Sequence, residues 1–339
     1  MNDKINMEDI ARALGISKVS VSKALNGKEG VSDELRTKVK ETAEAMGYRL
    51  NNSARSLRTD RQFNVGILIS EKFILDKEAY YFTVCGEMIR RLDELGYSGI
   101  MEIVTYQSED ACALPRLYNE NKVDGIIVLG QMHGDYLRKI ETVDVPLVFF
   151  DFYVNHSKTD CVVSDNFFSA YQLTNRLVAL GHRSIAYVGS IRSTSSIQDR
   201  FLGCYKSLIE NEIALPPAHV IEDRDDQGRF IPLALPDPLP SAFVCNCDRV
   251  AHALINQLKA VGIDVPGRVS VVGFDNSIFS TIADPQITTV DNNVEEMVRT
   301  CARIITKKIG DPERVYGRVM VSGTIIDRRS AQAVVSTNP

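Results

Sequence analysis

Short apolar stretches alternate with amphipathic stretches along most of the chain. From residue 63 onward, the apolar segments VGILIS, GIMEIV, GIIVLG and PLVFFD are each separated from the next by a stretch with helical spacing of apolar positions. The pattern restarts after CVVSD at residues 161–165, with IAYVG, VIED, AFVCN and VSVVGFD. Apolar runs rich in β-branched residues between helices are typical of parallel strands covered on both faces. Two such sets predict an α/β protein of two doubly wound lobes with a cleft between them.

This pattern predicts helices at about residues 79–95, 109–121, 167–180, 196–211 and 248–261. Beyond them, TTVDNN at residues 288–293 leads into one more helix and then into VMVSGTIIDR. We expect this last segment to cross back between the lobes.

Polar residues stand where several of the predicted strands end. Doubly wound sheets bind ligands beyond the carboxyl ends of their strands, so these residues are the first candidates for a ligand site. The alternative is that polar residues merely terminate strands. The residues are Ser70, Asp151, Ser190, Asn246 and Asp275.

The first 50 residues follow a different, wholly helical pattern. Residues 7–14 and 18–25 read as two short helices, with Gly15 as the turn and Ser17 as the N-cap of the second. A third helix begins near Ser32 and carries an apolar stripe that ends before Gly47. This arrangement favours a helix-turn-helix head whose second helix enters the major groove of DNA, although a generic helical hairpin would look similar.

The segment NNSARSLRTDRQ at residues 51–62 is polar apart from Leu57. A helix over residues 52–58 would be too short to form alone in water. Leu57 between Arg55 and Arg58 suits a wedge into the minor groove, with the arginines on phosphates. An ordinary flexible linker is the alternative.

The length and charge distribution of the chain limit the kinds of protein that it can be. A chain of 339 residues predicts two or three domains. Residues 1–61 carry a net charge of +3 and the remainder −8, so we expect any polyanion to meet the N-terminal part.

The sequence has no membrane span and no apolar leader, and its seven cysteines lack framework spacing. These features together favour a cytoplasmic protein with reduced thiols. Nucleotide-loop, metalloprotease and nucleophile-elbow motifs are missing, so we expect neither enzyme activity nor a cofactor or metal.

Taken together, the motifs resemble the LacI/GalR (lactose-repressor) family of transcriptional regulators over essentially the whole chain. The resemblance is carried by MEDIARALGISKVSVSKALNG, YRLNNSARSL, NVGILIS, VVSDN, GHRSIAYVGS, DRFLG, VSVVGFDNS and TTV, in this order. It implies a helix-turn-helix head at 1–49, a hinge helix or linker at 50–61 and a periplasmic-binding-protein-like core at 62–339. Within the core, the N-lobe is expected at about 62–163 and 293–321, and the C-lobe at about 164–291 and 322–335.

The resemblance also assigns roles to individual residues. In the head and hinge it implies base-reading, phosphate-contacting and minor-groove positions at Lys18, Val19, Ser20, Ser22, Lys23, Asn26, Asn51, Ala54 and Leu57, to which the residue pattern adds Arg55 and Arg58. In the core it implies effector-binding positions at Ser70, Tyr81, Phe82, Asp151, Ser196, Arg200, Asp275 and Asn292. Arg200 and Asp275 could instead pair with each other and only join loops.

Three departures from the family pattern leave the ligand open. Leu50 replaces a frequent proline, and Cys247 replaces a frequent asparagine that contacts sugars. Residues 225–243 have no clear aromatic at the usual stacking position, and their prolines argue against the usual helix. The chain also lacks a leucine-heptad tail after IIDRRS, which favours a dimer over a tetramer.

We therefore expect a dimeric repressor that binds a pseudo-palindromic DNA operator and is controlled by a small sugar or sugar derivative. Two alternatives keep the fold: a purine-type co-repressor that strengthens DNA binding, or a partner protein that co-regulates, as in catabolite control. A third alternative, from a different functional class, is a sugar-modifying enzyme with a DNA-binding head.

Overall fold

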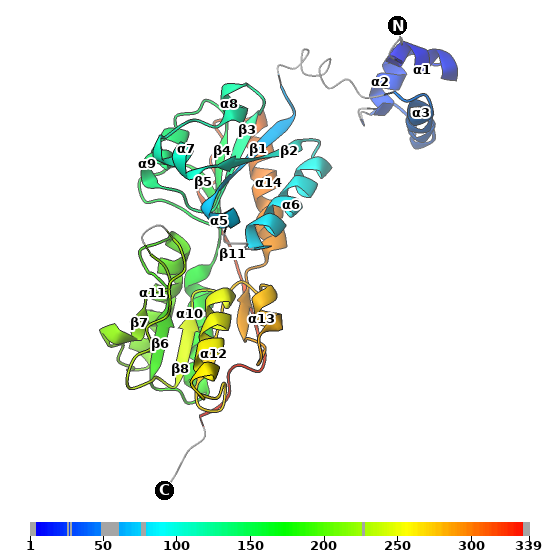
Figure 1. Ribbon diagram of the computed structural model, residues 1–339. Helices are drawn as coiled ribbons and strands as arrows, with labels where there is room; N and C mark the ends of the chain where they lie inside the picture. The colour runs from blue at the N-terminus through cyan, green and yellow to red at the C-terminus, as the bar shows by residue number, and fades with distance from the viewer. Residues whose placement is uncertain are drawn as a thin grey trace. The chain divides into compact units, whose positions relative to one another are not determined.

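The structure is a computed structural model that describes residues 5–25, 27, 29–48, 61–75, 79–225 and 228–334. It divides into two compact units, Met1–Gln62 and Phe63–Pro339 (Figure 1).

The first unit is built from three short helices, α1 (Met7–Leu14), α2 (Lys18–Leu25) and α3 (Asp33–Ala45). Each begins at a polar cap: Asn6 for α1, Ser17 for α2, whose hydroxyl accepts the Ser20 amide, and Ser32 for α3. Gly15 ends α1 in the left-handed region at φ 65°, which glycine adopts without strain. The predicted helix bounds and turn are thereby confirmed. The apolar stripes meet in one small core formed by Ile10, Ala11, Val21, Ala24, Val39 and Ala43.

The second unit begins with a lobe around a parallel six-stranded sheet in the order β11-β5-β4-β3-β1-β2. Its strands are β1 (Asn64–Ser70), β2 (Ser98–Val104), β3 (Gly125–Leu129), β4 (Leu147–Phe150), β5 (Asp160–Ser164) and β11 (Arg318–Val321). Helices α6 (Ala79–Glu94) and α14 (Val294–Gly310) pack on one face through apolar side chains such as Met88 and Ile305. Helix α9 (Gly134–Ile140) packs on the other face, and α5 (Lys72–Leu75) follows β1.

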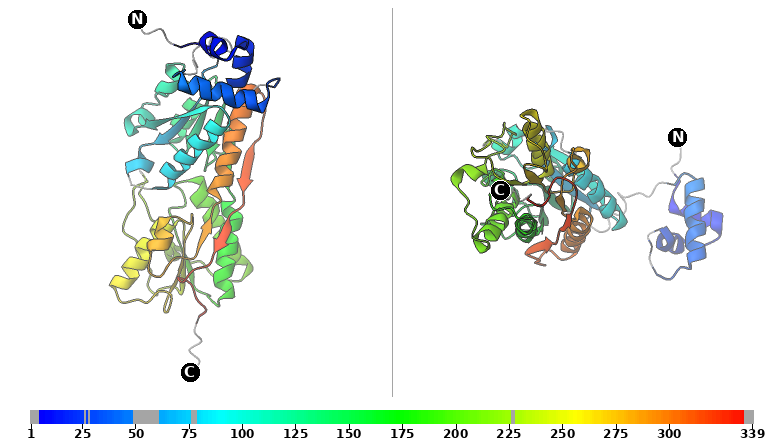
Figure 2. Two further views of the ribbon diagram at one scale, coloured as in Figure 1. Left: turned by 90° about the vertical axis from the view of Figure 1, so that its right-hand side faces the viewer. Right: turned by 90° about the horizontal axis from the view of Figure 1, so that it is seen from below.

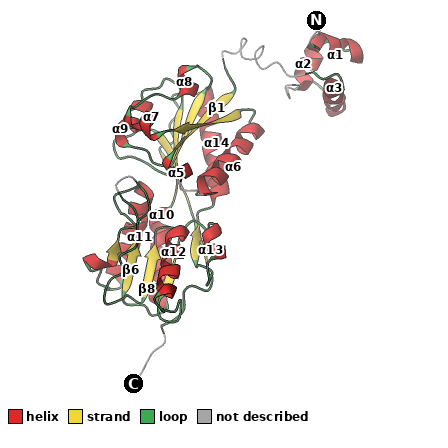
Figure 3. Cartoon of the chain, in the orientation of Figure 1, coloured by secondary structure: helices red, strands yellow, loops and turns green. Residues whose placement is uncertain are grey.

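The other lobe contains a parallel four-stranded sheet in the order β7-β6-β8-β9. The strands are β6 (Ile185–Val188), β7 (Val220–Ile221), β8 (Ala242–Cys245) and β9 (Ser270–Val272). Helices α10 (Asn166–Ala179) and α11 (Ser195–Glu210) cover one face, and α12 (Asp248–Ala260) covers the other. A short 3-10 helix, η1 (Pro217–His219), precedes β7, and α13 (Ile278–Ile282) follows β9. Helices therefore flank the sheet of each lobe (Figure 3), which confirms the predicted fold class.

Three chain segments join the lobes. The chain leaves the first sheet after β5 for α10, returns between β10 (Thr289–Asp291) and α14, and leaves again between β11 and β12 (Thr324–Ile326). Strands β10 and β12 pair antiparallel, and a bridge between Val272 and Thr288 ties them to β9. The two lobes are visible as separate bodies with these segments between them (Figure 2). A ligand that touches both lobes can therefore act on their relative position.

One predicted helix is wrong. Residues 109–121 form no continuous helix; α7 (Tyr106–Asp110) ends early and α8 (Arg116–Asn119) starts afresh. Pro115 caps the second helix because its ring fixes the backbone and it has no amide hydrogen to donate, so a helix cannot run through it. Cys112, in the left-handed region at φ 49°, marks the break.

Candidate functional site

The second helix of the N-terminal unit exposes the residues that sequence reasoning assigned to DNA. Val21 and Ala24 are fully buried, whereas the apolar side chain of Val19 is 64% exposed. The Lys18 ammonium is also exposed and lies 2.6 Å from Glu8 Oε1, a contact that lowers the pKa of Glu8. An exposed valine beside a lysine at the start of a short helix matches the side chains that read thymine methyl groups and guanine acceptors.

The remaining DNA candidates divide into two groups. Ser20, Ser22 and Lys23 are half-buried on α2, with the Ser20 hydroxyl 2.9 Å from that of Ser17. The others lie outside the described residues: Asn26, Asn51, Ala54, Arg55, Leu57 and Arg58.

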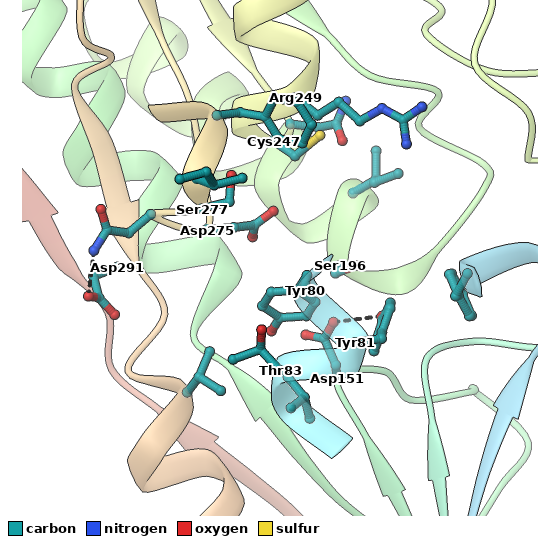
Figure 4. A pocket seen from close by; sticks show the side chains of 18 of the residues that line it. Tyr80, Tyr81, Thr83, Asp151, Ser196, Cys247, Arg249, Asp275, Ser277 and Asp291 are labelled. Atoms are coloured by element: carbon teal, nitrogen blue, oxygen red, sulfur yellow. Dashed lines mark hydrogen bonds between the residues drawn. The ribbon is translucent and has the colours of Figure 1, made fainter. Parts of the chain in front are cut away.

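A cavity of about 570 Å³ lies between the lobes of the second unit. It is formed at the carboxyl ends of the strands: Asp151 follows β4, Asn246 follows β8 and Asp275 lies just beyond β9. Side chains from α6 and from the loops after β8 and β9 complete it (Figure 4). Its walls carry carboxylates, guanidinium groups, hydroxyls and aromatic rings together. This mixture suits a polar ligand with several hydrogen-bonding groups.

Asp151 has the chemistry of a ligand-binding carboxylate. It sits at φ 70°, in the left-handed region, and is only 8% exposed. Its Oδ2 accepts a hydrogen bond from Tyr81 Oη at 2.9 Å, while its Oδ1 has no hydrogen-bond partner. Burial raises the pKa of this carboxyl to about 6. The positive charge of Arg200 lowers the pKa in part, and the negative charge of Asp275 raises it further. A buried acceptor without a donor is costly, so a ligand hydroxyl at Oδ1 would stabilise it.

Arg200 and Asp275 form an ion pair at the opposite wall. Arg200 Nη2 lies 3.0 Å from Asp275 Oδ1, its Nε donates to Asn166, and its Nη1 donates to the backbone oxygen of Asn246. The guanidinium also covers the Phe274 ring, 4.1 Å from its centre. The ion pair between Arg200 and Asp275, which the sequence allowed as an alternative to a ligand role, is therefore present in the structure. Both side chains nevertheless line the cavity, so the pair and a ligand role are compatible.

Five of the eight predicted effector residues line the cavity: Tyr81, Asp151, Ser196, Arg200 and Asp275. Ser70 is not among the lining residues, because its hydroxyl is buried and donates to Glu109. Asn292 also does not line the cavity; its Nδ2 donates to Asp275 Oδ1 at 2.8 Å, so it positions that carboxylate. Of the other strand-end residues, Asn246 lines the cavity and Ser190 does not.

The predicted aromatic pair is shifted by one residue. Phe82 is not a lining residue and is 46% exposed, whereas Tyr80 and Tyr81 line the cavity with their rings edge to face at 5.1 Å. One residue rotates a helix position by about 100°, which carries Phe82 off the cavity face of α6. The Tyr80 hydroxyl is buried, and burial raises its pKa well above the ordinary value.

Several lining residues were missed by sequence reasoning. Asn276 and Ser277 directly follow Asp275 in the same strand-end motif, so the strand-end rule could have found them. Arg224, in the segment after β7, and Arg249, in the first turn of α12, line the cavity as well, and no sequence signal pointed to them.

The proline-rich stretch at residues 225–243 runs without a helix through its described residues, as its prolines predict. It does bring one aromatic ring close to the cavity, which sequence reasoning overlooked: Phe230 packs on the core, and the guanidinium groups of Arg224 and Arg249 lie 4.8 Å and 4.0 Å from its centre. The ring itself is not a lining residue.

Other candidate chemistry has structural explanations. The His182 ring lies buried between the hydroxyls of Ser241 and Ser270 and the backbone oxygen of Gln332. None of the seven cysteines forms a disulfide bond, and the described residues contain no cluster of side chains that could hold a metal ion. Within the same residues, every helix is too short or too polar to cross a membrane.

Comparison with known proteins identifies two domains in this chain. Residues 6–51 match the model of the bacterial regulatory proteins of the lacI family, and residues 174–331 match the periplasmic binding protein-like domain. The chain is 25% identical to the probable HTH-type transcriptional repressor ExuR of Bacillus subtilis over 98% of this chain and all of that protein. It is 27% identical to the HTH-type transcriptional regulator RegA of Clostridium saccharobutylicum, over 96% of this chain and 98% of that one.

Solved structures share the fold. The lac repressor dimer bound to operator and the anti-inducer ONPF matches with a TM-score of 0.74 and 21% identity, covering 98% of this chain and all of that one. The complex of the transcriptional regulator CelR with cellobiose matches with a TM-score of 0.70 and 23% identity, covering 97% of this chain and all of that one.

Proposed function

Because this chain belongs to the bacterial lacI family of transcriptional regulators, we propose that it is a repressor whose operator affinity is set by a sugar-like ligand in the cavity between its lobes. In this proposal α2 reads bases in the major groove. Two copies of the chain bind the two halves of a pseudo-palindromic operator. The protein acts in the cytoplasm, where its operator lies, and catalyses no reaction.

The unpartnered Oδ1 of Asp151 is the observation that carries the ligand part of the proposal. It belongs to the first lobe, whereas the Arg200–Asp275 pair belongs to the second, and all three side chains line one cavity. A ligand whose hydroxyl groups reach both walls favours one arrangement of the lobes over others. That difference in affinity is what shifts a protein between two states of DNA binding.

The exposed Val19 supports the DNA part of the proposal. Its side chain contributes nothing to the core of the helical unit, in contrast to Val21 two residues later. Lys18 and Val19 then distinguish base pairs, and the charged surroundings supply general affinity for the phosphate backbone.

A second candidate, a flat aromatic co-repressor of the purine type, is favoured by the aromatic wall. Phe73, Tyr80 and Tyr81 all line the cavity, with the Phe73 and Tyr81 rings 4.6 Å apart. Such a wall suits stacking against a planar ring. In that case the ligand would strengthen operator binding instead of weakening it.

A thermal-shift screen of neutral and charged sugars and of nucleobases tests the proposal. Compounds that raise Tm are then added to a titration of operator DNA with the full-length protein. The proposal expects a sugar to raise Tm and to weaken operator binding. A nucleobase that strengthens operator binding would favour the second candidate, and a ligand that leaves operator binding unchanged would refute effector control.

A further inference from the structure

We propose that Tyr153 and Asp199 are positioning residues that hold the two walls of the cavity together, and that their contact helps to set the balance between the two states of operator binding. The inference deepens the proposed effector role of the cavity, and its second part rests on that role. Three hydrogen bonds that join the lobes beside the cavity carry it. We call them the interlobe contact.

The first lobe contributes Gln131 and Tyr153 to the interlobe contact. Gln131 follows β3, and Tyr153 follows β4, two residues after Asp151. The Tyr153 side chain packs on the apolar core of its own lobe, and the guanidinium of Arg318 on β11 lies 4.7 Å from the centre of its ring. Phe152, between Asp151 and Tyr153, is 1% exposed and belongs to the same core. The Tyr153 hydroxyl is therefore held in a fixed position relative to the Asp151 carboxylate.

The second lobe contributes two residues of α11. Ser195 and Asp199 are four residues apart, so they share one face of the helix. Ser196 and Arg200, each one position further on, line the cavity (Figure 4). Ile197 is buried in the core of the second lobe and holds the helix there. One helix thus has a face that meets the first lobe and a neighbouring face that lines the cavity.

The hydrogen bonds of the interlobe contact involve both side chains and backbone. The Tyr153 hydroxyl donates to Asp199 Oδ1 at 2.8 Å, and the Tyr153 amide donates to Ser195 Oγ at 3.2 Å. Burial and the neighbouring Asp199 raise the pKa of Tyr153 to about 12, so the phenol keeps the proton that it donates. Ser195 is the first residue of α11, where a backbone amide has no partner within the helix. This amide donates to Gln131 Oε1 at 2.8 Å.

The interlobe contact bears on ligand and operator binding because its residues move with the cavity walls. Asp151 and Tyr153 belong to one loop of the first lobe, and Ser196 and Asp199 belong to one helix of the second. A movement that separates these walls would lengthen the three hydrogen bonds. In the present arrangement both walls reach one cavity, so the contact favours the state that a ligand can bridge. Under the proposed function, that state has the weaker operator affinity.

Tyr153→Phe tests the inference, because it removes the hydroxyl and keeps the ring on the core. Tyr171→Phe is the matched control: the Tyr171 hydroxyl donates to Glu210 Oε2 at 2.6 Å, and both of these residues belong to the second lobe. Gln131→Met is a second variant, which removes the acceptor of the Ser195 amide and leaves Tyr153 unchanged.

Pulsed electron paramagnetic resonance on the full-length protein measures the separation of the lobes. One spin label replaces Lys139, which is exposed on α9 of the first lobe, and the other replaces Gln172, which is exposed on α10 of the second. The labels are attached to a non-natural keto amino acid, because the chain has seven cysteines of its own. Labelled chains are diluted with unlabelled protein, so that distances within one chain dominate.

We expect Tyr153→Phe and Gln131→Met to broaden the distribution of distances or to move its maximum, and Tyr171→Phe to reproduce the wild-type distribution. Wild-type distributions for both Tyr153→Phe and Gln131→Met would overturn the inference. The same change in Tyr171→Phe as in Tyr153→Phe would also overturn it, because the effect would then not depend on a contact between the lobes.

Operator affinity without added sugar tests the second part of the inference. With operator DNA selected from a random library, Tyr153→Phe should bind about fivefold more tightly than the wild type, which is the scale of one lost hydrogen bond. Tyr171→Phe should bind as the wild type does. A change of similar size in the opposite direction would support the interlobe contact and would favour the co-repressor candidate.

Failure of the inference is distinguishable from failure of the proposed function. Changed lobe distances with unchanged operator affinity would uphold the positioning role of Tyr153 and contradict control of operator binding by lobe movement. Unchanged lobe distances in the variants, with a sugar that changes the operator affinity of the wild type, would contradict the inference and leave the proposed function intact.

Discussion

Arg200 Nη2 and Asp275 Oδ1 lie 3.0 Å apart at the wall of the cavity, with the Asp275 carboxylate shared between Arg200 and Asn292. The side chains of Arg200 and Asp275 are only 7% and 19% exposed, so each charge depends on the other for compensation. Asp275 also sits at φ 96°, outside the ordinary backbone regions. Its geometry is thus fixed by backbone and side-chain contacts together.

Asp275→Asn tests whether this carboxylate binds the ligand. Asparagine tolerates left-handed backbone better than most residues and keeps an acceptor for Arg200, but it loses the charge. We expect ligand affinity to fall by about 2 kcal/mol, roughly thirtyfold, with operator affinity unchanged. Calorimetry and operator titration measure the two quantities.

Asp327→Asn serves as the control for this variant, because Asp327 pairs with Arg176 at the surface of the same lobe. If Asp275→Asn lowers Tm but binds the ligand as the wild type does, the Arg200–Asp275 pair only joins the loops.

The raised pKa of Asp151, about 6, predicts a pH dependence of ligand binding. A ligand hydroxyl donates more strongly to the ionised carboxylate, so affinity should rise between about pH 5 and pH 7 and protons should be released on binding. Asp151→Asn should remove this dependence. Calorimetry in buffers of different ionisation enthalpy counts the protons, and an unchanged pH profile in the variant would contradict the role of Asp151.

The same pKa predicts how Asp151 affects stability. Between about pH 4 and pH 6, Asp151 is still protonated in the native state but already ionised in the unfolded state. The free energy of unfolding of the wild type, relative to Asp151→Asn, should therefore fall by about 3 kcal/mol over this range and stay constant above it. The comparison removes the contribution of Asp248, whose pKa burial raises to about 7. A relative stability that rises over this range would show that the carboxyl is not destabilised by burial.

Val19→Gln tests α2 as the reading helix. Replacing an exposed methyl surface by an amide should change the preferred base at one position of each operator half-site, by about 1–3 kcal/mol. Thermal stability should hardly change, since Val19 is 64% exposed. Selection of binding sites from a random DNA library measures the preference. Val21→Gln should unfold the helical unit instead, and unchanged base preferences for Val19→Gln would refute the assignment.

Glu8→Gln tests the contact between Glu8 and Lys18. The Lys18 ammonium lies 2.6 Å from Glu8 Oε1, so in the free protein the carboxylate competes with DNA for it. The variant should bind operator DNA more tightly at low salt, and the gain should shrink at high salt. Glu34→Gln removes the same charge from α3 as a control. Equal gains for both variants would mean that only the overall charge matters.

Sequence reasoning succeeded where the determinants are local. Caps and turn residues such as Ser17 and Gly15 fix the bounds of α1 and α2, and strand-end positions located Asp151 and Asp275. It failed where the role of a residue depends on its exact position around a helix or on contacts with residues far away in the sequence. Phe82 lies one position off the cavity face of α6, and Pro115 divides a helix that apolar spacing alone favoured. Arg224 and Arg249 both lie over the Phe230 ring, an arrangement that no periodic pattern in the sequence reveals.

The central claim is that the cavity and the DNA-reading helix are coupled. The most direct measurement is the affinity of the full-length protein for the sugar that raises Tm most, by calorimetry with and without saturating operator DNA. Linkage requires the ratio of these two affinities to equal the factor by which the sugar changes operator affinity. The account predicts that operator DNA weakens sugar binding about tenfold or more. Equal sugar affinities with and without operator DNA would contradict it.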